Sequence, residues 1–395
     1  MDKHLYIFTA EYPFLRKENF LEDEIVYLAK EFKQITIIPL SGSGSPRAIP
    51  VNCVVDNGLC KRRLKKIIFG ICGSWRVLPQ YLNEYFSLGI YRSMSKTKSL
   101  LFNMIICSYY MQSSVIRKLM REIQKDDVVY FYWGVVYNTV APYLKGKAKL
   151  ISRFHGDWDL WTPSGKEGYK PGRKALITSL DKAIFISKKG RDFFQSIYPN
   201  VSTEVFHLGS RDIGIAKKSQ DGIIRIVSCS TVYPLKRVPL IFESVKTLKD
   251  ITVEWTHIGG GPDFEQLCNL VKKCPDNIKI NLTGAVSLDQ VFDYYKHNPV
   301  DVFINLSTNE GVPVSIMEAI SQDIPVVATN VGGNSEIVTS ETGTLVSADP
   351  TPEEVGFAIK KVINNKKLSP RQFWKKEFCA EENYTLFAKY LANKL

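Results

Sequence analysis

Short apolar runs alternate with longer amphipathic runs along the chain, and turns separate the two kinds of run. This alternation is typical of βα units on a parallel sheet. In the first half, the runs that predict strands are Leu5–Ala10, Ile35–Leu40, Val128–Trp133, Leu150–His155 and Ala183–Ser187. A helix is predicted over Phe20–Phe32, with Asn19 as its N-cap and Glu22 three residues further on.

A polar segment, Gly209–Gly222, predicts a linker, and the same pattern restarts after it. The strands expected there are Ile223–Ser228, Val253–Ile258, Ile278–Leu282, Val302–Leu306, Pro325–Thr329 and Gly343–Val346. The helices expected between and after them are about Val238–Lys249, Asp263–Lys273, Leu288–His297, Val314–Ser321 and Pro352–Asn364. The sequence therefore predicts two doubly wound α/β domains, divided between residues 212 and 213. Because ligands bind at the carboxyl ends of such strands, we expect the site in the cleft between facing domains.

Cysteine usage and apolar runs bear on the compartment. The eight cysteines are scattered, with no C-x-x-C pair and no zinc-ligand spacing, which fits a reducing environment. The run Leu5–Ala10 is too short for the apolar core of a signal peptide and ends at Glu11. The uncharged stretch Ser99–Ile116 is about as long as a membrane span, but its many polar residues favour a buried or half-buried helix.

The net charge of +12 is unevenly distributed, because basic residues are frequent from Lys61 to Arg121. Apolar and aromatic residues such as Ile68, Phe69 and Trp75 are interleaved with them. Basic residues with aromatic neighbours suit single-stranded nucleic acid or a membrane surface. A solvated basic face is an equally good interpretation.

The stretch from Asp301 to Thr344 carries the most chemical information. A predicted strand leads into the loop 307–313, and a helix with Glu318 in its first turns follows. Gly311 and Pro313 shape a tight entry to that helix, whose N-terminus suits a phosphate group. Two carboxylates, Glu310 and Glu318, would repel a phosphate unless they accept hydrogen bonds from sugar hydroxyls. The residues therefore indicate a nucleotide sugar, with ribose on one glutamate, hexose on the other and diphosphate between them.

The segment from Glu310 to Thr329 resembles the Glu-x7-Glu donor motif of retaining glycosyltransferases of family 4, and the following residues 330–338 resemble that family's Gly-Gly-x-x-Glu-Ile segment. The resemblance implies the GT-B fold, with two Rossmann-like domains facing a central cleft. It places Glu310 near the donor hexose and Glu318 on the ribose. The residues that would meet the sugar and the phosphates are Gly311, Val312, Pro313 and Val314.

A second motif, Ser228–Arg237, resembles the family loop that places an Arg and a Lys on the donor phosphates. Lys236 matches the Lys, but Thr231 stands at the position of the Arg, and Arg237 is expected to supply the second phosphate contact. Gly259 and Gly261 lie in a turn similar to the family's Gly-x-Gly-Pro turn beside the nucleotide base. Their spacing does not match a dinucleotide-binding fingerprint.

In the first domain, residues 151–157 are similar to the family's Ser-Arg-x-His-Gly-x-Asp segment. The resemblance places His155 on the donor hexose beside the reacting centre, so that His155 and Glu310 are the expected catalytic residues. The residues expected on the acceptor side are Glu18, Asn19, Phe20, Asp157 and Trp133, with Asn19 standing where the family often has Thr. The tail resembles the family's closing helix, which returns to the first domain at about residues 378–395.

The resemblance implies a retaining hexosyltransferase that acts on a glycan or a polyprenyl-diphosphate-linked acceptor in the biosynthesis of O-antigen, capsule or exopolysaccharide. A UDP-sugar is expected as donor rather than a GDP-sugar, with no metal and no further cofactor. We expect a cytoplasmic protein, attached peripherally to the inner face of an anionic membrane, with no nucleic-acid partner. The alternatives are a non-catalytic GT-B protein that binds sugar or lipid, an NAD-type dehydrogenase, and a GT-B epimerase or phosphorylase.

Overall fold

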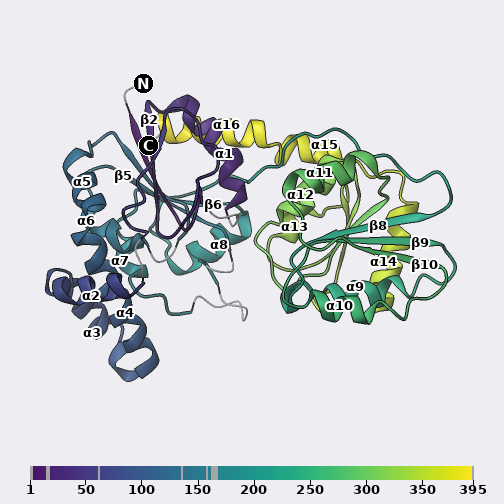
Figure 1. The fold of residues 1–395 in the computed structure, drawn as a ribbon, viewed down its shortest axis with the longest axis horizontal. Coiled ribbons are helices and arrows are strands. Elements are labelled where there is room, and N and C mark those ends of the chain that lie inside the picture. Colours follow the sequence, from purple (N-terminus) through teal and green to yellow (C-terminus); the bar gives the residue numbers. More distant parts are fainter. Residues whose placement is uncertain are drawn as a thin grey trace. The chain divides into compact units, whose positions relative to one another are not determined.

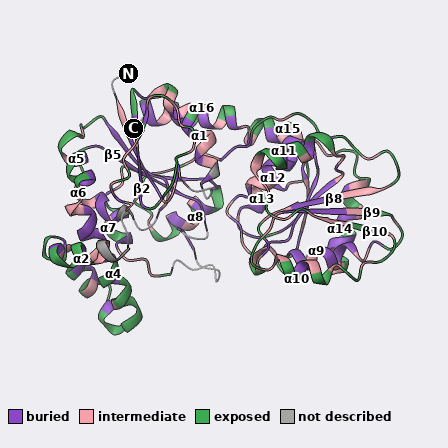
Figure 2. Cartoon of the chain, viewed as in Figure 1, coloured by how far each residue is buried: buried purple, intermediate pink, exposed green. Residues whose placement is uncertain are grey.

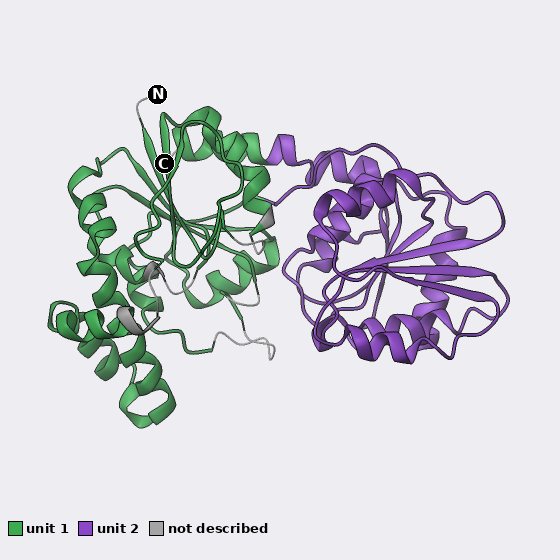
Figure 3. Cartoon of the chain, in the orientation of Figure 1, with its two compact units in different colours: residues 1–206, 384–395 green, residues 207–383 purple. Residues whose placement is uncertain are grey.

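The computed structural model describes residues 3–14, 18–60, 63–134, 137–156, 159–161 and 168–393. The chain divides into two compact units (Figures 1 and 3). Unit 1 holds residues 1–206 and 384–395, and unit 2 holds residues 207–383. Each unit is built on its own parallel sheet with helices on both faces, as expected for an α/β fold.

The sheet of unit 1 has seven strands in the order β3-β2-β1-β4-β5-β6-β7. The strands are β1 His4–Thr9, β2 Gln34–Pro39, β3 Cys53–Val55, β4 Val128–Phe131, β5 Lys149–Phe154, β6 Lys182–Phe185 and β7 Thr203–Val205. The two short edge strands, β3 and β7, are absent from the sequence-based prediction because three residues give no readable periodicity. One apolar cluster packs on each face of the sheet, and the strand residues between them are buried on both sides (Figure 2).

Helices of unit 1 follow its strands. They are α1 Asn19–Glu31, α2 Arg63–Gly73, α3 Leu78–Ser87, α4 Met94–Gln112, α5 Ser114–Glu122, α6 Ala141–Leu144, α7 Arg173–Ile177 and α8 Lys188–Ile197. The expectation that Asn19 caps α1 is wrong by one residue, because the helix begins at Asn19 and Glu18 occupies the N-cap position. The insertion between β3 and β4 carries α2, α3 and α4 as a separate layer, with a small core of its own around Tyr81 and Leu100.

The sheet of unit 2 has six strands in the order β10-β9-β8-β11-β12-β13. The strands are β8 Ile224–Cys229, β9 Val253–Ile258, β10 Ile278–Leu282, β11 Val302–Asn305, β12 Val326–Thr329 and β13 Gly343–Val346. The helices are α9 Val238–Val245, α10 Phe264–Leu270, α11 Leu288–His297, α12 Val314–Ser321, α13 Asn334–Ile337, α14 Pro352–Asn364 and α15 Pro370–Glu377. A final helix, α16 Ala380–Asn393, begins in unit 2 and ends in unit 1.

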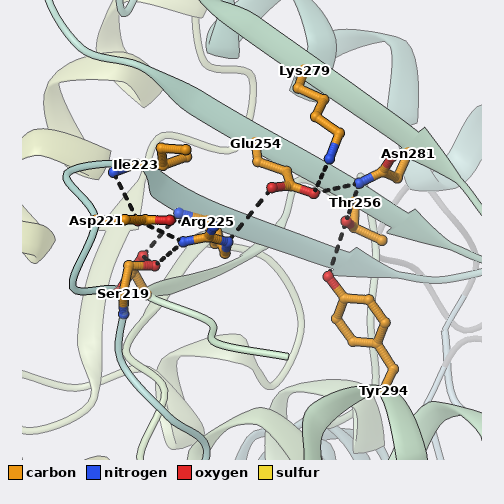
Figure 4. Close-up of polar contacts among 10 residues, drawn as sticks. Ser219, Asp221, Ile223, Arg225, Glu254, Thr256, Lys279, Asn281 and Tyr294 are labelled. Atoms are coloured by element: carbon orange, nitrogen blue, oxygen red, sulfur yellow. Dashed lines mark hydrogen bonds and ion pairs between the residues drawn. The ribbon is translucent and has the colours of Figure 1, made fainter. Parts of the chain in front are cut away.

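The segment predicted as a linker belongs to unit 2, because polar contacts hold it against the amino ends of that sheet. Arg225 on β8 pairs with Asp221 at 2.7 Å and donates to Ser219 Oγ at 3.0 Å (Figure 4). Its Nε lies 3.5 Å from a carboxylate oxygen of Glu254 on β9. The unit boundary therefore falls at residues 206 and 207 rather than at 212 and 213.

Among the described residues, no single helix is long and apolar enough to cross a membrane. Helices α4 and α5 are long and apolar enough only when taken together, and they are bent against each other by 61°. Within the stretch Ser99–Ile116, residues such as Leu100, Cys107 and Tyr110 are buried in unit 1.

Candidate functional site

Each sheet has one place where the strand order reverses, and the loops on either side of it diverge to leave a crevice at the carboxyl ends of the strands. In unit 2 the reversal lies between β8 and β11, and in unit 1 it lies between β1 and β4. Lys236 follows β8, and Glu310 follows β11. Glu18 follows β1, and Trp133 follows β4. The predicted residues therefore flank both reversals, and each unit is described by itself below.

Three neighbouring loops of unit 2 are joined by hydrogen bonds at the carboxyl edge of its sheet. The amide of Thr308, after β11, donates to the Leu235 carbonyl oxygen in the β8 loop at 2.8 Å. The amide of Gly333, after β12, donates to the Gly311 carbonyl oxygen at 2.7 Å. At Gly332, with φ of 49°, a Cβ would lie 1.7 Å from the Glu310 carbonyl oxygen, so only glycine permits this approach.

Lys236 and Glu310 form an ion pair across the reversal in unit 2. The Lys236 Nζ lies 2.5 Å from Glu310 Oε1, which also accepts from Ser307 Oγ at 2.6 Å and from Asn305 Nδ2 at 3.2 Å. Glu310 is buried. Within the described part of the chain, Glu310 Oε2 has no hydrogen-bond partner and Lys236 uses one of its three donors. One acceptor oxygen and two cationic donors thus remain for a ligand.

Glu318 lies on α12 and is buried near the same edge. Burial, and next the charge of Glu318, raise the pKa of the Cys229 thiol at the end of β8, while Lys236 lowers it. The carboxylate and the ammonium group therefore both lie close to Cys229. No side chain of the described residues caps α12 at Pro313, so its first amide groups are left for solvent or an anion.

Arg237 has a different environment from its neighbour Lys236. Its backbone is left-handed, with φ of 46°, and its guanidinium donates to the carbonyl oxygens of Leu306 at 2.6 Å and Ala348 at 2.8 Å. It also pairs with Asp349 at 3.0 Å. These bonds tie the β8 loop to the loops after β11 and β13. Its expected phosphate contact stays a prediction, as does the consequence of Thr231, whose side chain is exposed.

The glycine turn after β9 packs against the β8 loop. A Cβ on Gly259, with φ of 140°, would lie 2.0 Å from the Ser230 carbonyl oxygen, and one on Gly261 would lie 2.4 Å from that of Val232. The turn is therefore limited to glycine for steric reasons. Val312 and Pro313 are buried beneath the β11 loop, whereas Gly311 and Val314 are partly exposed.

In unit 1, Glu18 lies at the reversal between β1 and β4 and binds the loops on both sides of it. Its carboxylate accepts from the amides of Ala10, Glu11 and Tyr12 at 2.7 to 3.0 Å and from the Trp133 indole at 2.6 Å. Glu18 is buried. The carboxylate thus joins the β1 loop, the start of α1 and the end of β4.

His155 lies beside this cluster at the end of β5, with its ring 4.4 Å from that of Trp133. Burial, and next the charge of Arg153, lower the pKa of His155 to about 3. The neutral ring donates from Nε2 to the Tyr132 carbonyl oxygen at 2.9 Å, because a carbonyl oxygen only accepts. Nδ1 has no partner among the described residues and is therefore an acceptor for a ligand hydroxyl.

The sequence-based analysis missed three residues that position this site, Asn305, Ser307 and Asp159. Asn305 and Ser307 hold Glu310 Oε1 in unit 2. In unit 1, the buried carboxylate of Asp159 accepts from the amides of His155 and Gly156 at 2.8 to 3.0 Å. The carbonyl group of Tyr132 orients the His155 ring. A polar residue at the end of an otherwise apolar strand, as at Asn305, is the signal that would have found one of them.

The remaining predicted residues are placed only in part. Phe20 lies in the first turn of α1 and is partly buried. Asp157 and the side chain of Asn19 lie outside the described residues. In the part of the chain that the structure describes, no three His, Cys, Asp or Glu residues are grouped as metal ligands would be.

Comparison with known proteins places the fold. Residues 214–377 match the family model described as Glycosyl transferases group 1. An uncharacterized glycosyltransferase of Methanocaldococcus jannaschii is 24% identical over 66% of this chain and 72% of that protein. The O-antigen biosynthesis glycosyltransferase WbnH of Escherichia coli is 30% identical over 27% of this chain, and the match spans 29% of that protein.

Solved structures resemble the whole chain. The lipopolysaccharide outer core galactosyltransferase WaaB, in its apo form, superposes with a TM-score of 0.67 at 14% identity and 100% coverage of both chains. The Anabaena protein HepE, in complex with UDP, superposes with a TM-score of 0.65 at 13% identity and 99% coverage of both chains. At these identities the likeness establishes the fold alone, and the chain has the GT-B fold of two Rossmann-like domains.

Proposed function

We propose that this chain is a retaining glycosyltransferase that moves a hexose from a nucleotide sugar to a glycan or lipid-linked acceptor. The observation that carries the proposal is the Lys236–Glu310 pair at the strand reversal of unit 2, with free donors on the lysine and a free acceptor oxygen on the glutamate. Such a pair suits a ligand that is anionic at one end and rich in hydroxyls at the other. A nucleotide sugar is a ligand of this kind.

In the proposed reaction, Lys236 and the first amides of α12 bind the diphosphate, Glu318 binds the ribose, and Glu310 Oε2 accepts a hexose hydroxyl. As the glycosidic bond to phosphate breaks, negative charge develops on the leaving diphosphate, and Lys236 stabilises it. His155 Nδ1 accepts a further hexose hydroxyl. We propose front-face attack, in which the leaving diphosphate takes the acceptor proton, with no metal required.

A UDP-sugar is the proposed donor, and its chemistry is supported by HepE, whose structure holds UDP. The proposed setting is assembly of a cell-surface polysaccharide on the cytoplasmic side of a membrane. It is supported by WbnH, which is named for O-antigen biosynthesis, and by WaaB, which is named for the lipopolysaccharide outer core. A polyprenyl-diphosphate-linked glycan on an anionic membrane is the proposed acceptor, and the basic residues from Lys61 to Arg121 favour such a surface.

The test is a thermal-shift screen of nucleoside diphosphates and their sugars, followed by transfer assays with the donor that raises the melting temperature most. NMR of the product should show the anomeric configuration of the donor retained. Glu318→Ala should lower donor use roughly 10- to 100-fold, since a charged hydrogen bond contributes about 1.5–3 kcal/mol. A chain that binds nucleotide sugars but neither transfers nor hydrolyses them would favour the non-catalytic alternative.

A further inference from the structure

The helical layer formed by α2, α3 and α4, residues 63–112, exposes apolar surface in a pattern that helices normally bury. On α2 and the short 3₁₀ helix after it, Ile68, Ile71, Cys72 and Trp75 are spaced i, i+3, i+4 and i+7, and all four are exposed. This spacing usually marks the core-facing stripe of a helix. The exposed fractions of Ile68, Ile71 and Trp75 are 53%, 58% and 68%.

Packing against α4 explains why the large apolar side chains of α2 are exposed. The side of α2 that faces α4 carries glycines, because a Cβ on Gly70 would lie 2.2 Å from the Ile105 carbonyl oxygen and one on Gly73 would lie 2.0 Å from Gln112 Nε2. The two helices thus approach closely through small residues. The large apolar side chains of α2 are left on the outer side.

Helix α3 repeats the pattern. Leu78, Leu82 and Phe86 follow one another at four-residue spacing and are exposed by 39%, 44% and 65%. The inner side of the helix is held to unit 1 by two residues. Tyr81 donates to Asn103 Oδ1 at 2.7 Å, and Glu84 accepts from the Gly172 amide. The exposed apolar side chains of α3 therefore do not contribute to the packing of unit 1.

Exposed apolar side chains are concentrated in this layer. Of the twenty large apolar residues that the structure describes as exposed, twelve lie between residues 63 and 112. They are Ile68, Phe69, Ile71, Trp75, Leu78, Leu82, Phe86, Leu88, Tyr91, Met94, Leu101 and Phe102. Such a concentration of exposed apolar side chains in one segment is typical of an interaction site.

The charges of the layer decide which partner fits it. Residues 63–112 contain seven basic residues and one acidic residue, Glu84, and Glu84 is buried. Arg76 lies over the ring of Trp75 at 5.1 Å, and Arg92 lies over the ring of Tyr91 at 5.4 Å. Lys66 points inward, with its Nζ donating to the Leu40 carbonyl oxygen at 2.8 Å, so it adds nothing to the outer charge. Exposed aromatic side chains that are paired with arginines, in a segment whose single acidic residue is buried, match the interface of an anionic bilayer.

We propose that the outer face of α2, α3 and α4 is a docking surface that inserts its apolar stripes into the interface of an anionic lipid bilayer. The proposal rests on the proposed function, to which it adds the surface that brings the chain to a lipid-linked acceptor. Insertion of apolar side chains distinguishes it from attachment by charge alone, because part of the binding then survives salt.

The experiment is co-flotation of the full chain with vesicles of phosphatidylglycerol and, separately, of phosphatidylcholine, at low and at physiological salt. The wild-type chain should float with the anionic vesicles at both salt concentrations and should float much less with the neutral vesicles at either. The double variant Ile71→Glu/Trp75→Glu should bind at least roughly tenfold more weakly, because two apolar anchors become charges that the lipid repels. Circular dichroism should be unchanged, since both side chains are exposed.

Phe357 on α14 of unit 2 provides the matched control, because it is 73% exposed but lies outside the layer. Phe357→Glu should bind vesicles like the wild type. Trp75 is itself a fluorescent probe of insertion, because its side chain is 68% exposed, and Trp75→Phe separates its signal from that of the other tryptophans. Its fluorescence should shift to the blue on anionic vesicles, and Trp75→Phe should abolish the shift. The proposal would be overturned if the wild-type chain did not bind anionic vesicles, or if Phe357→Glu lost as much vesicle binding as the double variant. It would also be overturned if sedimentation showed the wild-type chain to be a dimer and the double variant to be a monomer, because the layer would then be a dimer interface.

Donor hydrolysis and transfer to a soluble acceptor separate this proposal from the proposed function. If the double variant keeps both activities but loses transfer to an acceptor embedded in vesicles, both proposals stand. A wild-type chain that binds vesicles without any transferase activity would remove the proposed function and leave the docking surface in place. A wild-type chain that transfers sugar without binding vesicles would leave the proposed function in place and remove the docking surface.

Discussion

The strand reversals of the two units share a topology and differ in what their polar groups contact. In unit 1, the Glu18 carboxylate at the reversal accepts four hydrogen bonds from the protein. In unit 2, Lys236 and Glu310 contact each other at 2.5 Å, and each keeps hydrogen-bonding capacity for a ligand within the described part of the chain. A reversal creates a crevice in both sheets, and among the described residues the one in unit 2 carries an ion pair with hydrogen-bonding capacity left for a charged ligand.

This difference assigns different tasks to the two edges. At the edge of unit 1, the protein itself binds the buried Glu18 carboxylate, which orients Trp133 beside the neutral ring of His155. The edge of unit 2 is charged and exchangeable, since a phosphate can compete with Glu310 for Lys236. Removing the Glu18 carboxylate should therefore affect stability, whereas removing Lys236 or the Glu310 carboxylate should affect ligand binding.

The largest effect is expected at Lys236. Lys236→Met should weaken nucleoside diphosphate binding roughly 10- to 100-fold, because it removes a charged donor worth about 1.5–3 kcal/mol. Arg237→Met is the matched substitution one residue away. It should lower the free energy of unfolding by about 1–3 kcal/mol, because it leaves backbone carbonyl groups without donors, and it should change affinity much less. Calorimetric titration and urea unfolding of both variants measure the contrast, and an equal loss of affinity in the two variants would refute it.

The opposite result is expected for Glu18. Glu18→Ala should lower the free energy of unfolding by about 1.5–3 kcal/mol, since it removes the carboxylate that accepts hydrogen bonds from three backbone amides and an indole. Affinity for nucleoside diphosphates should stay at the wild-type value. Glu22→Ala serves as control, because Glu22 is partly exposed in its pair with Arg47, and it should cost less than about 1 kcal/mol. Lost nucleotide binding in Glu18→Ala would show that unit 1 also determines affinity.

A smaller effect concerns pH. His155 is neutral in the folded chain because burial lowers its pKa to about 3, whereas an unfolded histidine titrates at about 6.5. The unfolded state then binds more protons below pH 6.5, so this histidine costs stability as pH falls from there, at most about 1.4 kcal/mol per pH unit. His155→Asn should flatten the decline between pH 6.5 and 5. His297→Asn, on the exposed end of α11, should leave the decline unchanged, and the same slope in wild type and His155→Asn would count against a buried neutral ring.

Much of the fold could be predicted from the sequence, because long apolar runs and helical spacing leave few alternatives. Helices Leu288–His297 and Pro352–Asn364 begin and end where the pattern predicts. The strands β3 and β7 were missed, since edge strands of three residues are formed by tertiary pairing rather than by local pattern. The unit boundary was displaced because a polar segment resembles a linker even when Arg225 holds it to a sheet.

The site was predictable as a set of residues but not as a set of contacts. The motifs located Lys236 and Glu310, and nothing in their spacing indicated that the two side chains form an ion pair. The role of Arg237 depends on which carbonyl groups the loops after β11 and β13 bring to it, and that is a property of the tertiary structure. Apolar residues such as Ile68 and Trp75 were recognised among the basic residues, but their exposure could not be predicted, because a periodic pattern does not say which side of a helix is covered.

The measurement that tests the central claim most directly is calorimetric titration of Glu310→Gln with UDP and with the UDP-hexose chosen by the thermal-shift screen. The account predicts that affinity for UDP stays close to wild type, because Lys236 and the α12 amides are retained. It also predicts that the additional affinity contributed by the hexose falls roughly tenfold, because a carboxylate that accepts a hydroxyl is replaced by an amide. Equal affinity of the variant and the wild type for the UDP-hexose would contradict the placement of the donor sugar at Glu310.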